Sequence, residues 1–267
     1  MKKLLIFFVI IFCFRGAAFS QTDRDDDDFS PIDAYYLGRA VAANILAKYK
    51  PYDNTETIKY INNICQTLVI NSNYPLPYNG YFVMILDSNE FNAFATPGGH
   101  IFVTRKLVES ASSEDMLAAV IAHELAHIML RHGISVINSV KLENELSAIA
   151  DWAASTAASK NAAAARAAAF RDSIATTVDV LMRSGYSQPQ EFEADLEALV
   201  LLANAGYDPN ALKDMLKVLQ GAKGSAKSGL YSTHPSPERR IANIESLKFR
   251  KNETLRYRVP RFKSMKF

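Results

Sequence analysis

Two histidines and a glutamate near the middle of the chain have the types and spacing of a metal site. Residues 123–127 read His-Glu-Leu-Ala-His, an HExxH sequence within a strongly apolar stretch. On a helix, residues four positions apart lie one above the other, so His123 and His127 can turn ring nitrogens toward one ion. Glu124 neighbours that face, where its carboxylate can accept a proton from a metal-bound water. HExxH also arises by chance, but buried histidines and acids are costly without partners, so we predict a metal site.

A third metal ligand is expected further along the chain, because catalytic zinc usually has three protein ligands and one open position. The two cysteines, Cys13 and Cys65, cannot form a cysteine zinc cluster, so the ligands must be His, Asp or Glu. Residues 191–195 read Glu-Phe-Glu-Ala-Asp, which places Glu191 and Asp195 on one helix face. Glu191 can then bind the metal, and Asp195 can accept the free N–H of a bound histidine. The alternative is a solvated acidic helix face.

The spacing of apolar residues predicts the elements that would position these side chains. Helical periodicity and capping signals predict helices over residues 32–50, 55–70, 112–132, 188–205, 208–221 and 236–247. Three short runs, 81–86, 91–95 and 100–104, are rich in β-branched and aromatic residues and predict a small antiparallel sheet. Gly133 is expected to end the HExxH helix. We therefore expect a mainly helical α+β protein with the sheet beside that helix.

An alanine-rich stretch, residues 148–169, separates the two segments that carry the predicted ligands. Thirteen of its 22 residues are alanine, which favours helix but offers little side chain for packing. Two interpretations remain at this point: a weakly held helix that acts as a mobile lid over the cleft, or an ordinary close-packed helix.

The two ends of the chain differ in composition from the rest. Residues 1–20 combine two lysines, an apolar run and small residues, and are expected to be a signal peptide. Residues 21–30 carry five aspartates and are expected to be an acidic disordered tail. Residues 248–267 carry eight basic residues and one acid, which predicts a solvated basic tail; the alternative is contact with an anionic membrane or an envelope protein. Residues 31–247 are expected to form one domain.

The charge balance argues against nucleic acid as a partner. The chain has 30 Lys and Arg against 28 Asp and Glu, and without its first twenty residues the numbers are 27 and 28. Nucleic-acid-binding domains carry a marked basic excess, so no nucleic-acid partner is expected. Hydrophobic residues make up 49% of the chain, which excludes a mainly disordered protein.

Four segments follow the order found in one group of zinc peptidases. They are Asn-Ala-Phe-Ala-Thr-Pro-Gly-Gly-His-Ile at 92–101, HELAH followed by Arg-His at 131–132, EFEAD at 191–195, and Ser-Thr-His-Pro at 232–235. Over roughly residues 35–247 the chain resembles gluzincin peptidases of the HtpX and CAAX prenyl endopeptidase type, and is most similar to the soluble periplasmic BepA- and LoiP-like members. The resemblance implies a zincin (gluzincin) fold and one Zn²⁺ per chain, held by His123, His127 and Glu191. It also implies Glu124 as the general base.

The same resemblance implies a zinc-dependent endopeptidase that hydrolyses peptide bonds of unfolded or misassembled envelope proteins. It implies secretion across the inner membrane to a periplasmic or outer-membrane-associated location. A polypeptide substrate is then expected to bind as an added strand at the sheet edge, with little sequence preference. The edge residues that would bind it are Asn92, Ala93, Phe94 and Ala95.

His234 matches a histidine that can lie near the zinc in the periplasmic members. It could take a catalytic role by donating to the oxyanion, or act as a fourth ligand that silences the enzyme. A plainer interpretation is a loop histidine that caps the last helix. The alternative function is a non-proteolytic, chaperone-like binding factor in envelope protein quality control, with a self-inhibited zinc site.

Two further features bear on the resemblance. Arg131 and His132 match the family and are expected to make packing or second-layer contacts. Family members often carry an arginine just before the Glu-x-x-x-Asp helix, whereas residues 187–190 here read Ser-Gln-Pro-Gln. Any contact made by that arginine is therefore in doubt.

Overall fold

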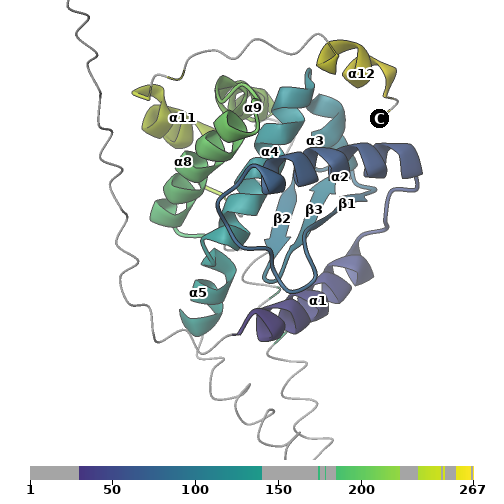
Figure 1. Ribbon diagram of the computed structural model, residues 1–267, viewed down its shortest axis with the longest axis vertical. Coiled ribbons are helices and arrows are strands. Elements are labelled where there is room, and N and C mark those ends of the chain that lie inside the picture. The colour runs from purple at the N-terminus through teal and green to yellow at the C-terminus, as the bar shows by residue number, and fades with distance from the viewer. Residues whose placement is uncertain are drawn as a thin grey trace, which may run out of the picture.

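The computed structural model describes residues 30–139, 174, 178, 185–222, 234–247, 249, 257–265 and 267 (Figure 1). The expected signal peptide, the acidic tail up to residue 29 and the alanine-rich stretch, with both of its interpretations, lie outside the described residues. The elements are α1 (Pro31–Lys48), α2 (Thr55–Ile70), β1 (Phe82–Leu86), β2 (Ala93–Thr96), β3 (His100–Thr104), α3 (Arg105–Ser110), α4 (Glu114–Met129), α5 (His132–Ser139), α8 (Gln188–Asn204), α9 (Asn210–Gly221), α11 (Pro237–Glu245) and α12 (Arg258–Ser264). Within the described part of the chain, no helix is long and apolar enough to span a membrane.

Helix α4 carries the HExxH sequence and lies at the centre of the fold, between α8 and the sheet (Figure 1). The Ser113 side chain accepts a hydrogen bond from the Met116 N–H, and Glu114 and Asp115 occupy the positive first turn. Thirteen of its sixteen residues are buried. Polar groups on this helix must therefore find partners inside the protein.

The end of α4 differs from the prediction. The helix stops at Met129, and Arg131 adopts the left-handed backbone conformation with φ 58°, so Gly133 does not end it. Gly133 instead lies inside α5, where an added Cβ would come within 3.2 Å of Pro97 Cγ. The glycine is explained by this close approach to the β2–β3 turn.

The sheet has three strands in the order β1-β3-β2. Strands β2 and β3 pair antiparallel, but β1 and β3 pair parallel, so the prediction of a purely antiparallel sheet is wrong for that pair. The reason is that the chain crosses from β1 to the far side before turning back: Gly98 and Gly99, with φ of 81° and 113°, form the tight turn that brings β3 in between. Strand β2 is left at the edge of the sheet, facing α4.

Within the C-terminal segment, the structure describes a helix, α12, that packs on the rest of the fold. Residues 258–264 form α12, and the buried Arg258 donates to Asp115 Oδ1 at 2.8 Å and to the Gly206 carbonyl at 2.7 Å. Arg261 pairs with Glu114, which is also buried. The expectation of a solvated tail is therefore wrong for α12, because its basic residues neutralise the acids in the first turn of α4.

The Arg258–Asp115 pair gives a testable stability prediction. Replacing Arg258 with Met would leave Asp115 charged and buried with one partner fewer, so we expect the free energy of unfolding to fall by about 3 kcal/mol. Urea unfolding followed by circular dichroism measures the change. The matched control is Lys263→Met on the exposed side of α12, expected to change stability by no more than about 0.5 kcal/mol. Equal losses in the two variants would contradict this account of α12.

Candidate metal centre

Three histidines and one glutamate meet in the interior between α4, α8 and the start of α11. Each of His123, His127, Glu191 and His234 offers one ligand atom, and these atoms all lie within 4.8 Å of one another. His123 Nε2 is 3.1 Å from His127 Nε2, and the Glu191 oxygens lie 3.5 Å and 3.4 Å from those two nitrogens. His234 Nδ1 is 2.6 Å from Glu191 Oε1. The structure thus brings together the three predicted ligands and His234.

The chemistry of this cluster fits a zinc ion. Imidazole nitrogens and a carboxylate oxygen are ligands that zinc takes, and three protein ligands with a fourth variable position are typical of catalytic zinc. All four side chains are buried, and among the described residues Glu191 Oε2 has only distant donors, His123 Nε2 at 3.5 Å and Arg240 Nη1 at 3.7 Å, with no well-formed hydrogen bond. A buried carboxylate oxygen without a well-formed hydrogen bond is costly, and a cation at the centre would satisfy it.

The surroundings control the protonation of the ligands. Burial works against the charged form of Glu191, but electrostatic interaction with His234 and hydrogen bonds with the histidines outweigh it and hold the Glu191 pKa well below its usual value. Burial lowers the pKa of His127 well below its usual value, which favours the neutral imidazole that binds metals. For His123, burial and Arg240 lower the pKa, whereas hydrogen bonds with Asp195 and Glu191 raise it to about 9 in the metal-free protein.

Asp195 lies behind His123, on the side away from the cluster. Its Oδ1 is 3.2 Å from His123 Nδ1, so it can accept the Nδ1 proton and leave Nε2 free for a metal. Arg240 of α11 donates to both oxygens of Asp195, at 3.0 Å and 2.6 Å. Burial raises the pKa of Asp195, but Arg240 and the His123 hydrogen bond lower it to about 2.

His127 is held by a different set of partners. Its Nδ1 lies 2.9 Å from His132 Nδ1, and His132 Nε2 lies 3.3 Å from Glu193 Oε2. If His127 donates to His132 and His132 donates to Glu193, the Nε2 of His127 keeps its lone pair toward the cluster. The ring of Tyr186 stacks on His127 with centroids 3.9 Å apart and an interplanar angle of 14°.

Glu124, the predicted general base, follows the ligand candidate His123 on α4. Its carboxylate is buried, and Oε2 has no hydrogen-bond partner within the described part of the chain. Burial raises its pKa, although the nearby His234 and His123 oppose the shift. A carboxylate with a raised pKa can hold a proton during a reaction cycle at neutral pH.

The predicted edge residues form β2 and the residue before it, and all are buried. The Thr104 N–H donates to the Asn92 carbonyl, so alternation along the strand directs the main-chain groups of Ala93 and Ala95 to the open edge. One main-chain group of each residue already has a hydrogen-bond partner. The Ala93 N–H donates to Asn92 Oδ1, and the Tyr186 hydroxyl donates to the Ala95 carbonyl at 3.4 Å.

Three residues around this centre, Arg240, Tyr186 and Glu193, escaped the sequence analysis. Arg240 could have been noticed because it shares a buried helix face with Pro237 and Ile244, an unusual place for an arginine. Tyr186 precedes α8 in a loop, where no periodic pattern marks a buried side chain. The stretch 187–190 that departs from the family instead starts α8: the Ser187 N–H donates to the Gln190 side chain, and Pro189 lies in the first turn.

An HExxH helix whose histidines meet a glutamate from a second helix, beside a small sheet, defines the gluzincin class of metallopeptidase fold. The sequence model of Peptidase family M48 matches residues 56–248. The chain belongs to this family, as its motifs had indicated.

Individual relatives agree with the family assignment. The chain is 30% identical over 194 residues to the beta-barrel assembly-enhancing protease of Escherichia coli K12, an alignment that covers 70% of this chain and 38% of that protein. It is 33% identical over 188 residues to a putative protease of the same name from Vibrio cholerae, covering 69% and 38%. It is 35% identical over 160 residues to the mitochondrial metalloendopeptidase OMA1 of Schizosaccharomyces pombe, covering 58% and 42%. The chain therefore spans about two fifths of the length of these relatives.

The contact between His127 and His132 gives a prediction for metal affinity. In His132→Phe the His127 Nδ1 proton loses its acceptor, so we expect zinc affinity to fall by about 10- to 100-fold. Competition with a chromophoric zinc chelator measures it. The control is His100→Phe, because His100 lies outside the cluster and stacks on Tyr35. An unchanged affinity in His132→Phe would show that His132 does not support the ligand.

Proposed function

We propose that this chain is a zinc-dependent endopeptidase. The observation that carries the proposal is the buried cluster of His123, His127 and Glu191, with Glu124 beside the two histidines on α4 and its Oε2 atom without a hydrogen-bond partner among the described residues. Zinc, when bound, supplies Lewis-acid polarisation of the scissile carbonyl and acidifies the attacking water. Membership of Peptidase family M48 supports the same reaction class.

Glu124 is the residue that transfers protons in the proposed reaction. Its carboxylate accepts the proton of the attacking water and returns it to the amine of the leaving peptide. The apolar interior around α4 favours the protonated form of Glu124, which is the form the second step needs. Asp195 and Arg240 keep His123 oriented, and His132 with Glu193 does the same for His127.

We propose that substrates are unfolded or misassembled envelope polypeptides that bind in extended form along β2. The sheet edge at Asn92, Ala93, Phe94 and Ala95 supports this mode, because main-chain groups of Ala93 and Ala95 point away from β3 and an extended chain could gain hydrogen bonds there. Binding requires the Tyr186 hydroxyl to leave the Ala95 carbonyl. The names of the bacterial relatives connect them with β-barrel assembly and support a periplasmic or outer-membrane-associated location for this chain. The proposed signal peptide at residues 1–20 agrees with export.

We further propose that His234 acts as a reversible fourth ligand. Its 2.6 Å contact with Glu191 and its ligand atom within 4.8 Å of those of the other three residues support this role, because His234 could then join them in holding a zinc ion. Such a site is closed until a substrate or partner draws His234 away.

The His234 proposal predicts a gain of activity. We expect His234→Ala to raise turnover of casein by about tenfold, the gain for a site closed in nine of ten molecules. Turnover by a fluorescent casein assay is compared at equal zinc content in both proteins. A fall in turnover instead would assign His234 to the oxyanion role.

The second candidate function, a non-proteolytic binding factor with a self-inhibited centre, is favoured by the same His234–Glu191 contact. The casein experiment separates the two functions. If neither the wild type nor His234→Ala cleaves casein while both bind it, the binding factor replaces the enzyme.

The base role of Glu124 predicts a separation of metal binding from catalysis. We expect Glu124→Gln to lower casein turnover by about 10²- to 10⁴-fold while one zinc per chain stays bound. Turnover is measured beside zinc content by plasma mass spectrometry. Removing zinc from the wild type with a chelator should abolish turnover, and added zinc should restore it. Substantial turnover by zinc-loaded Glu124→Gln would remove Glu124 from this role.

The remaining proposed partner is a membrane surface or envelope protein that contacts the basic C-terminal residues. Arg258 and Arg261 are engaged with acids of α4, so this contact would depend on the other basic residues of 248–267. The charge balance continues to support the absence of a nucleic-acid partner.

A further inference from the structure

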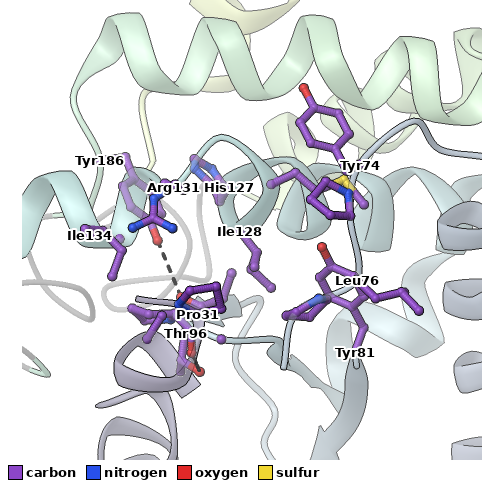
Figure 2. Close-up of a pocket in the computed structure, with 18 residues that line it drawn as sticks. Pro31, Tyr74, Leu76, Tyr81, Thr96, His127, Ile128, Arg131, Ile134 and Tyr186 are labelled. Atoms are coloured by element: carbon purple, nitrogen blue, oxygen red, sulfur yellow. Dashed lines mark hydrogen bonds between the residues drawn. The ribbon is translucent and has the colours of Figure 1, made fainter. Parts of the chain in front are cut away.

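A pocket of about 200 Å³ opens beside the metal centre, on the side of His127 (Figure 2). It lies between the beginning of α1, the loop that follows α2, the β2–β3 turn and the junction of α4 with α5. Tyr186 forms one wall, with its ring stacked on His127. The pocket therefore borders a proposed metal ligand directly.

The lining of this pocket is mostly apolar. Aliphatic and proline side chains dominate it, and Figure 2 shows Leu76 and Tyr81 on one side and Ile134 and Tyr186 on the other. Among its lining residues, Arg131 is the one that carries a permanent charge. An apolar cavity of about 150 Å³ is large enough to hold benzene, so this space suits a phenyl ring or a branched aliphatic group.

The pocket is continuous with the open edge of the sheet. Ala95 and Thr96 of β2 line it, and the Ala95 carbonyl at that edge is the group that Tyr186 contacts. A peptide added to β2 projects alternate side chains to opposite faces. One of those side chains would pass over the mouth of the pocket while the main chain runs past the metal centre.

The other side of the centre offers much less room. Beside His123 and Glu124 the free space is about 30 Å³, closed in by side chains such as Val120 and Leu216. Of these two spaces, only the pocket beside His127 is large enough for a large side chain. This asymmetry gives a substrate one preferred position relative to the centre.

We propose that the pocket beside His127 binds one large apolar side chain of the substrate polypeptide and thereby fixes where the chain is cut. The proposal rests on the proposed peptidase function, which it extends to a substrate class: extended segments with an isolated aromatic or large aliphatic residue. Such residues are buried in folded proteins and exposed in unfolded ones, so the pocket would select unfolded chains.

The binding test uses Glu124→Gln as purified and three twelve-residue peptides of Gly, Ser and Thr that differ at one central position. That position is Phe, Ser or Lys. Burying the Phe ring should make its peptide bind about tenfold more tightly than the other two, by fluorescence anisotropy. Equal affinities for the three peptides would overturn the proposal.

A matched pair of variants locates the preference. Leu76 lines the pocket and is 67% exposed, and Ile70 lies outside it and is 76% exposed, so Asp at either position should leave the fold intact. In the Glu124→Gln background, Leu76→Asp should reduce the Phe preference to less than about threefold, because it puts a charge at the pocket mouth. Ile70→Asp should keep the full preference. A preference that survives Leu76→Asp would place recognition elsewhere.

The cleavage test uses wild-type protein and peptides in which the single Phe is moved one residue at a time. Mass spectrometry of the products should show a cut at a constant number of bonds from Phe. Cuts that ignore the Phe position would overturn the pocket proposal and leave the peptidase function standing. Phe-dependent binding without any cleavage would contradict the peptidase function and leave the pocket proposal standing. The failures of the two proposals are therefore distinguishable.

Discussion

The whole site depends on placing three imidazoles and a carboxylate next to one another in an apolar interior. His123, His127, Glu191 and His234 are all buried, and one oxygen of Glu191 has no well-formed hydrogen bond among the described residues. In water these groups would be hydrated, so their burial is unfavourable unless something at the centre replaces the water. A single divalent cation bound by these four side chains would do so for all of them at once. The rest of the fold can then be understood as the framework that holds these four side chains close to one another.

Within that framework, the two histidines of the HExxH sequence are each supported by a separate set of hydrogen-bond partners. Asp195 and Arg240 hold His123, whereas His132 and Glu193 hold His127; α8 supplies one carboxylate to each set, and α11 and α5 supply the other members. These contacts fix the orientation of the His123 and His127 rings, which reduces the ordering cost of binding a metal. The same logic extends to α4 itself, because its buried acids at the other end are neutralised by α12.

The parts of this structure that follow local rules could be predicted from the sequence. Helix α2 has the predicted bounds, and the HExxH and Glu-x-x-x-Asp spacings identified the residues that meet, because spacing on a helix decides which side chains share a face. Contacts between distant segments could not be predicted in this way. The parallel pairing of β1 with β3, the docking of α12 and the position of Arg240 depend on tertiary packing, for which periodicity carries no signal. The end of α4 was missed because Arg131, a poor candidate for a left-handed conformation, takes the role expected of Gly133.

The central claim is that one zinc ion is held jointly by two imidazoles and one carboxylate from helices far apart in the sequence. X-ray absorption spectroscopy at the zinc edge, on protein purified without added chelator, measures this most directly. The account predicts one zinc per chain with nitrogen and oxygen neighbours at about 2.0–2.1 Å, an imidazole signal that is weaker in His127→Phe, and a reduced first shell in Glu191→Ala. A protein that contains no zinc, or a spectrum unaffected by either substitution, would contradict it.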